Sequence, residues 1–113
     1  MKSKISSISK NEDFKSLLGG RRISSKYITI FFKTLSNKNN KKLNISFVTK
    51  KKIGNAIKRN KIKRRLRNIT NDATKKMNIN LDYCYLIIAR SAVLDDPYEN
   101  IKQNLFNVFK KIK

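Results

Sequence analysis

The sequence has no histidine, one cysteine and only seven acidic residues among its 113. Histidine is the commonest general base and metal ligand in proteins, so its absence removes the usual starting point for catalysis and for metal binding. The single cysteine, Cys84, excludes a disulfide framework and a cysteine-based zinc site, and it indicates a reduced, cytoplasmic setting. We therefore predict no metal site in the protein.

The few acidic residues do not form the carboxylate set that a nuclease needs. None lies between Phe14 and Asn71, and the neighbours Glu12 and Asp13 are explained as first-turn helix residues that favour the helix dipole. A protein that hydrolyses a phosphodiester bond alone needs metal-binding carboxylates or an acid–base pair. The sequence has neither, and it has no glycine-rich phosphate loop. We predict no catalytic residue in this chain and no small-molecule substrate.

Long apolar runs are absent as well. No stretch approaches the roughly 20 apolar residues of a membrane span. The first ten residues lack the apolar segment of a secretory signal. We therefore expect no membrane association.

Positive charge, in contrast, is abundant. The net charge is +21 and the pI is about 10.5, values that imply a polyanionic partner. A chain of this length forms one domain by default. We interpret residues 1–8 as a flexible basic arm and residues 9–113 as a single domain, which the family resemblance given below makes an RNA-binding domain.

One strongly basic helix organises the rest of the sequence. Four apolar residues recur at helical spacing on one side: Ile62, Leu66, Ile69 and Ala73. The opposite side carries Asn60, Lys63, Arg64 and Arg67, and Lys61 and Arg65 border it. Like charges at i, i+4 destabilise an isolated helix by a few tenths of a kcal/mol per pair, and a bound polyanion relieves this repulsion. The pattern predicts a phosphate-binding helix that begins near Ala56, after Asn55 as its cap, and ends between Asn71 and Met77.

The remaining patterns predict a small mixed domain. The expected elements are a helix from the Ser9 capping box to Gly19, a basic loop over residues 21–26, a hairpin of strands 27–35 and 43–49, a central strand over residues 83–89 and a C-terminal helix. Asp96 is the expected N-cap of that last helix, with Pro97 in its first turn. The fold class is α+β, an α/β sandwich with the order α-β-β-(β)-α-β-α. The basic helix then forms the crossover of a βαβ unit with parallel strands.

A known family shares the basic segment. Residues 51–67 read Lys-Lys-Ile-Gly-Asn-Ala-Ile-Lys-Arg-Asn-Lys-Ile-Lys-Arg-Arg-Leu-Arg. This segment resembles the signature of the bacterial ribonuclease P protein subunit, which is built around Arg-Asn-Arg followed by a hydrophobic residue, Lys and Arg. Lys61 replaces the third residue of that triplet, so it keeps the charge and loses the planar guanidinium.

The resemblance implies two sets of site residues. The RNA-binding residues would be Lys51, Lys52, Asn55, Arg59, Asn60, Lys61, Lys63, Arg64, Arg65 and Arg67. The cleft for the 5′ leader of precursor tRNA would involve Phe14, Leu18, Ile28 and Ile30.

The resemblance also implies the function and the partners. The chain would be the non-catalytic protein subunit of an endoribonuclease that removes the leader from precursor tRNA. Its partners would be the catalytic RNA, in about a 1:1 ratio, and the precursor tRNA. The cofactor would be Mg²⁺, bound mainly by the RNA.

Other readings remain open. The main alternative is a ribosomal or other structural RNA-binding protein with no role in cleavage, because composition alone does not separate the two. A helix-turn-helix DNA-binding protein is a weaker alternative, since a strand rather than a short helix precedes the basic helix.

Overall fold

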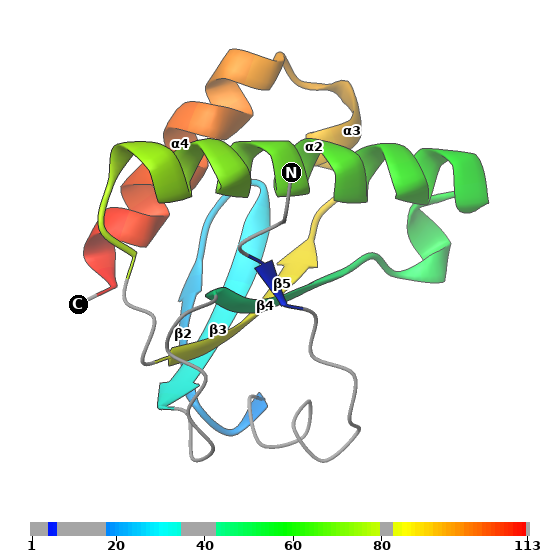
Figure 1. Cartoon of the computed structure of the whole chain (residues 1–113). Coiled ribbons are helices and arrows are strands. Elements are labelled where there is room, and N and C mark those ends of the chain that lie inside the picture. Colours follow the sequence, from blue (N-terminus) through cyan, green and yellow to red (C-terminus); the bar gives the residue numbers. More distant parts are fainter. Residues whose placement is uncertain (1–4, 7–17, 35–42, 80–82, 113) are drawn as a thin grey trace.

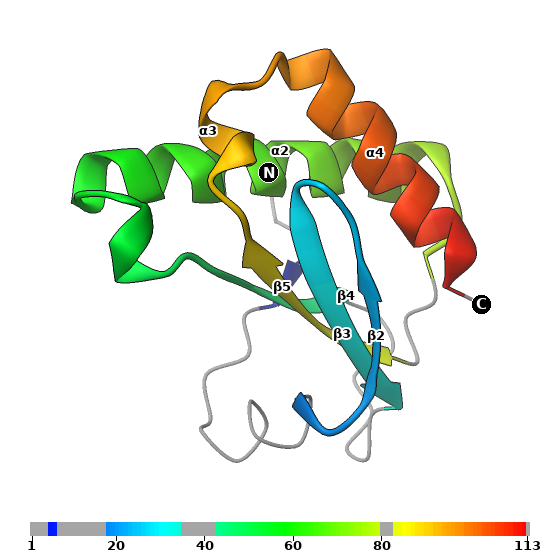
Figure 2. The same ribbon diagram turned by 180° about the vertical axis from the view of Figure 1, so that it is seen from behind.

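The fold is a mixed β-sheet with its α-helices packed on one face (Figures 1 and 2). The structure is a computed structural model, and it describes residues 5–6, 18–34, 43–79 and 83–112. In the order β1-β4-β5-β3-β2, the sheet contains β1 (Ile5–Ser6), β2 (Arg21–Ser24), β3 (Ile28–Thr34), β4 (Leu43–Val48) and β5 (Tyr83–Ala89). The helices are the 3-10 helix η1 (Lys51–Ile53), α2 (Ala56–Lys76), α3 (Ala92–Asp95) and α4 (Tyr98–Lys111). This arrangement confirms the predicted α+β class. The helix predicted from Ser9 lies outside the described residues, except at its end near Leu18.

Strand β5 lies at the centre of the sheet, as predicted. It pairs in parallel with β4 and antiparallel with β3, and α2 makes the crossover from β4 to β5. The predicted hairpin of strands 27–35 and 43–49 is wrong, because β5 is inserted between β3 and β4. The continuous apolar run of β5 explains this position, since such strands are found in the buried middle of a sheet.

Two segments that were expected to be irregular are strands. Arg21–Ser24, predicted as a basic loop, pairs with β3 and places Ile23 opposite Ile30. A single isoleucine among polar residues gives little period-two signal, so the strand was not predicted. Ile5–Ser6 pairs in parallel with β4 at the other edge of the sheet. The other residues of the predicted arm, 1–4 and 7–8, lie outside the described residues.

The main core lies between the sheet and the helices. Ile30 on β3, Tyr85 and Ile87 on β5 and the apolar stripe of α2 are all fully buried in one cluster. The opposite face of the sheet has a smaller cluster around Phe31 and Leu86. Among the described residues, no helix combines the length and the apolar character needed to cross a membrane.

The start of α4 differs from the prediction. The cap position belongs to Pro97, and no side chain makes a capping hydrogen bond there. Asp96 instead accepts a 2.7 Å hydrogen bond from the Tyr27 hydroxyl and lies 3.0 Å from the Lys26 ammonium. The carboxylate thus joins the turn between β2 and β3 to the turn before α4. The short helix α3 was not predicted, because four residues are too few to show a helical period.

Asp96 gives the fold a testable sensitivity to acid. Hydrogen bonds from Tyr27 and then Lys26 hold the pKa of the Asp96 carboxyl below its ordinary value of 3.8. A lowered folded-state pKa stabilises the fold at pH values above the unfolded pKa, and this contribution is lost as the pH falls through the folded pKa, below about pH 4. Tyr27→Phe removes the stronger bond. We expect the variant to unfold at a lower temperature at neutral pH and to lose less stability between about pH 5 and pH 2. Thermal unfolding followed by circular dichroism measures both effects.

The exposed neighbour Asp95 provides a matched control. Asp95→Asn removes the same type of charge one residue away but leaves the Tyr27–Asp96 bond in place, so it should keep the acid sensitivity that this bond produces. An acid profile of Tyr27→Phe identical to that of the unchanged protein would contradict the role of the Tyr27–Asp96 bond.

Candidate nucleic-acid interface

Helix α2 begins as the sequence predicts. The Asn55 side-chain oxygen accepts a 3.0 Å hydrogen bond from the backbone N–H of Lys58. Gly54, at φ 156°, turns the chain from η1 into the helix, and a Cβ at this position would lie 2.8 Å from Cδ of Lys58. The first turn of α2 contains no acidic residue. The positive end of the helix dipole therefore adds to the charges of Lys51 and Lys52 on η1.

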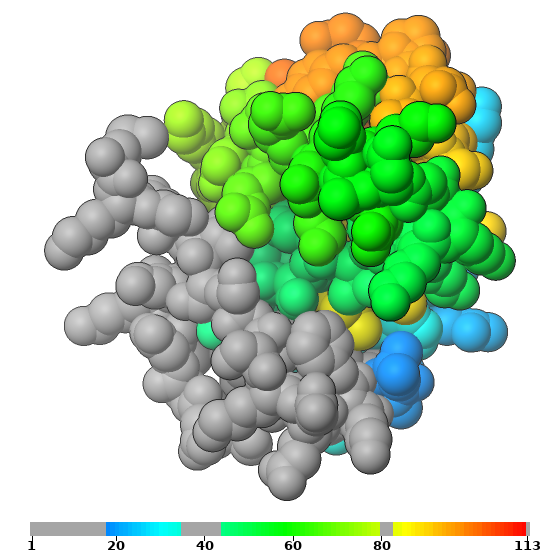
Figure 3. Space-filling model, turned by 90° about the vertical axis from the view of Figure 1, so that its right-hand side faces the viewer, coloured from blue at the N-terminus to red at the C-terminus, as the bar shows by residue number. Residues whose placement is uncertain are grey.

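The two sides of α2 have the predicted environments. Ile62, Leu66, Ile69 and Ala73 are each 0% exposed. Asn60, Lys61, Lys63, Arg64 and Arg67 are all exposed on the other side. Figure 3 shows the green side chains of the η1–α2 segment across the middle of one face of the molecule. We call the side formed by Asn60, Lys61, Lys63, Arg64 and Arg67 the basic face.

Two arginines of α2, Arg67 and Arg59, differ in their surroundings from the rest of the exposed charges. The Arg67 guanidinium lies 5.9 Å from the ring centroid of Phe47, a buried residue of β4. Arg59 is half-buried, and its Nε has no hydrogen-bond partner among the described residues.

Arg65, predicted to bind RNA from the border of the basic face, makes contacts within the protein. Its Nη1 donates hydrogen bonds to the backbone carbonyls of Val93 at 2.9 Å and Asp96 at 3.1 Å, with a longer contact to Leu94 at 3.4 Å. These carbonyls end α3, where a cation is favourable. Arg65 therefore fixes the loop after β5 to α2 through its Nη1. Asn55 is likewise engaged through its oxygen as the helix cap.

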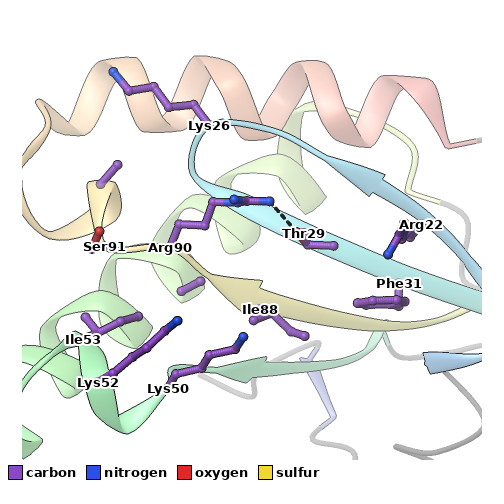
Figure 4. A pocket seen from close by; sticks show the side chains of 12 residues that line it. Arg22, Lys26, Thr29, Phe31, Lys50, Lys52, Ile53, Ile88, Arg90 and Ser91 are labelled. Carbon is purple, nitrogen blue, oxygen red and sulfur yellow. Dashed lines mark hydrogen bonds between the residues drawn. The ribbon is translucent and has the colours of Figure 1, made fainter.

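A hollow on the opposite face of the sheet from α2 adjoins the start of this helix (Figure 4). Its volume is about 680 Å³. Strands β2, β3 and β5, the segment 50–53 and the residues after β5 all contribute to its wall. Among the residues that the structure describes, five cations and no acid line it: Arg22, Lys26, Lys50, Lys52 and Arg90.

The hollow combines positive charge with apolar surface. Phe31, Ile53 and Ile88 provide apolar lining, and Arg90 is fixed by a 3.1 Å hydrogen bond to the Thr29 hydroxyl. Cations that bind phosphate next to apolar or aromatic surface that contacts bases are typical of sites for single-stranded nucleic acid.

The structure overturns part of the predicted leader cleft. Ile28 and Ile30 are 1% and 0% exposed and face the core beneath the helices, so neither can contact a ligand. Phe14 lies outside the described residues. Leu18 is 52% exposed and remains a candidate.

The hollow also contains residues that the sequence analysis missed, namely Arg22, Lys26, Phe31, Lys50 and Arg90. Phe31 lies on the other side of β3 from Ile30, and apolar residues occupy both sides of this strand. The alternation of residues along β3 thus separates its two sides but does not show which side the helices cover. The charge of Arg22 and Lys26 was visible in the sequence, but no local pattern joined them to Arg90.

Comparison with known proteins identifies the family. A family model described as Ribonuclease P matches residues 2–113. The chain belongs to the ribonuclease P protein family. The ribonuclease P protein component of Carboxydothermus hydrogenoformans is 33% identical over 110 residues, which cover 94% of this chain and 90% of the relative. That of Streptococcus thermophilus is 31% identical over 107 residues, with 94% and 91% covered.

Solved structures of the ribonuclease P family share the fold. An RNase P protein structure from Staphylococcus aureus superposes with a TM-score of 0.73 at 27% identity, covering 95% of this chain and 94% of that one. The RNase P protein from Thermotoga maritima has a TM-score of 0.79 at 22% identity, with 96% and 98% covered, and shows the likeness of fold alone. The resemblance seen in residues 51–67 is confirmed.

Arg64 and Arg65 are adjacent in the sequence and should behave differently on substitution. Arg65→Ala removes a charged donor from backbone carbonyls, so we expect the free energy of unfolding to fall by about 2 kcal/mol. Arg64→Ala changes an exposed side chain and should alter it by less than about 0.5 kcal/mol. Urea denaturation of both variants measures the difference. Equal losses would show that Arg65 does not anchor the loop.

Proposed function

We propose that this chain binds the catalytic RNA of ribonuclease P and the 5′ leader of precursor tRNA, and that the RNA performs the cleavage. The observation that carries the proposal is that two cationic surfaces adjoin at η1, which precedes α2 and whose Lys52 lines the hollow. One is the basic face of α2, and the other is the hollow on the far side of the sheet. We further propose one protein per RNA and a cytoplasmic location.

The basic face suits the catalytic RNA. Its exposed arginines and lysines belong to a rigid helix and can contact successive phosphates, which positions an RNA without reading its sequence. Arginine binds phosphate oxygens at two points, so Arg64 and Arg67 are the residues we expect to contribute most. Arg59, half-buried at the start of α2, adds a further guanidinium beside this face.

The hollow suits the single-stranded leader. Unpaired nucleotides expose base faces as well as phosphates, and the hollow offers apolar lining beside its five cations. Lys52 belongs to η1 and also lines the hollow, so a leader bound there would lie next to an RNA bound along α2. Leader and catalytic RNA would thus be held together by one protein.

Magnesium is assigned to the RNA in this proposal. Within the described parts of the chain, no three His, Cys, Asp or Glu residues lie together in a way that could hold a metal ion. The protein would instead lower the Mg²⁺ requirement by neutralising phosphates with lysine and arginine.

The alternative of a structural RNA-binding protein without a role in processing is not favoured. Positive charge alone is compatible with either function. The match of the family model across residues 2–113 and the relatives of the same name weigh for ribonuclease P.

A double substitution in the hollow tests the proposal. Arg22→Ala with Lys50→Ala removes two exposed cations from the wall of the hollow. We expect the holoenzyme, reconstituted with a bacterial ribonuclease P RNA, to bind precursor tRNA roughly tenfold more weakly. Its affinity for mature tRNA, which lacks the leader, should stay the same. Equilibrium binding of the two tRNAs measures this selectivity.

Two exposed lysines on α4 provide the control. Lys110→Ala with Lys111→Ala removes the same charge from a helix on the other face of the sheet. This control should leave the preference for precursor tRNA intact. An equal loss of affinity for both tRNAs in the Arg22/Lys50 variant would refute the assignment of the hollow to the leader.

A further inference from the structure

Ile57 is an apolar side chain in an unusual place. It lies in the first turn of α2 and is 80% exposed. Among the described residues, the only other large hydrophobic side chain with high exposure is Leu18, at 52%. Neither hydrophobic cluster of the described residues includes Ile57. The fold therefore does not use this side chain in its core.

The surroundings of Ile57 are cationic. Lys61 and Arg64 follow it at i+4 and i+7, the spacing that aligns side chains along one side of a helix. The only acidic residue of α2, Asp72, lies four turns further along and is paired with Lys102 at 3.3 Å. Ile57 thus lies on the same side of α2 as the basic face, one turn closer to the start of the helix.

Local helix stability gives no reason for an isoleucine here. At an exposed helical position, isoleucine is less favourable than alanine, lysine or arginine, because its branched side chain loses rotamer freedom. Protein-binding sites combine several apolar residues in one patch and are depleted in lysine. A single isoleucine surrounded by lysine and arginine has the opposite composition, which favours a nucleic-acid ligand.

We propose that Ile57 packs against an unstacked base of the RNA that binds the basic face. The inference rests on the proposed function. A base in a duplex is stacked on both sides, so apolar contact requires an unpaired, displaced nucleotide. Lys61 and Arg64 would hold the flanking phosphates while Ile57 covers the base. The contact would add affinity that does not depend on counterion release.

Salt dependence separates this contact from the charged ones. Binding of a bacterial ribonuclease P RNA is measured at several salt concentrations for the unchanged protein and for three variants. Ile57→Ala should bind about tenfold more weakly at every salt concentration, with an unchanged slope of log affinity against log salt. Arg64→Ala should make that slope shallower by roughly 0.7 to 0.9. Ile57→Leu, which keeps the apolar surface, should bind within about twofold of the unchanged protein.

Two further measurements make the test specific. The Tm of Ile57→Ala should equal or exceed that of the unchanged protein, because alanine is the better helix former. Chemical probing of the RNA bases should reveal a base that the unchanged protein protects and that becomes reactive with Ile57→Ala.

The possible failures are distinguishable. Unchanged affinity of Ile57→Ala beside a shallower slope for Arg64→Ala would overturn the Ile57 contact and leave the proposed function standing. No effect of either substitution would refute the proposed RNA-binding face itself. A lower Tm of Ile57→Ala together with weaker binding would show that Ile57 supports the fold, and would also overturn the inference.

Discussion

The structure depends on how α2 is held on the sheet despite its own charge. The helix carries nine lysines and arginines against one aspartate, and its like-charged i, i+4 pairs destabilise it by roughly 1 kcal/mol in total. Burial of Ile62, Leu66 and Ile69 against the sheet contributes roughly 6 kcal/mol, several times the repulsion. The apolar stripe therefore fixes which side of α2 faces outward. The outward position of the basic face follows from this orientation.

Side-chain contacts also connect α2 to the loop after β5, and that loop to the turn between β2 and β3. Arg65 of α2 binds the carbonyls at the end of α3, and Asp96 in that loop binds Tyr27 in the turn between β2 and β3. Lys26 in this turn and Arg90 after β5 line the hollow. The contacts that stabilise the fold thus also set the position of the hollow's walls relative to the basic helix. The two proposed binding surfaces lie on opposite faces of the sheet, so they can act together only if this relation is rigid.

Local patterns predicted some parts of this arrangement well. The cap at Asn55, the buried stripe of α2 and its outward charges follow from helical period and capping chemistry, which depend on neighbours in the sequence. The position of β5 between β3 and β4 depends on pairing between distant segments, so the sequence suggested a hairpin that does not form.

The site residues show the same division. Ile28 and Ile30 were assigned to the ligand side of β3, whereas they face the core and Phe31 faces the hollow. Helical position placed Arg65 at the border of the basic face. Only the tertiary fold brings the carbonyls of Val93 and Asp96 to it.

The central claim is that the basic face of α2 supports cleavage by an RNA catalyst and takes no part in the chemistry. The most direct measurement is cleavage of precursor tRNA by a bacterial ribonuclease P RNA at low Mg²⁺. Cleavage is measured for the RNA alone, for the RNA with this protein, and for the RNA with a variant in which Lys63, Arg64 and Arg67 are each replaced by glutamine. The account predicts that only the unchanged protein restores cleavage and that the variant needs more Mg²⁺. Cleavage by the protein without RNA, or equal activity of the variant, would contradict it.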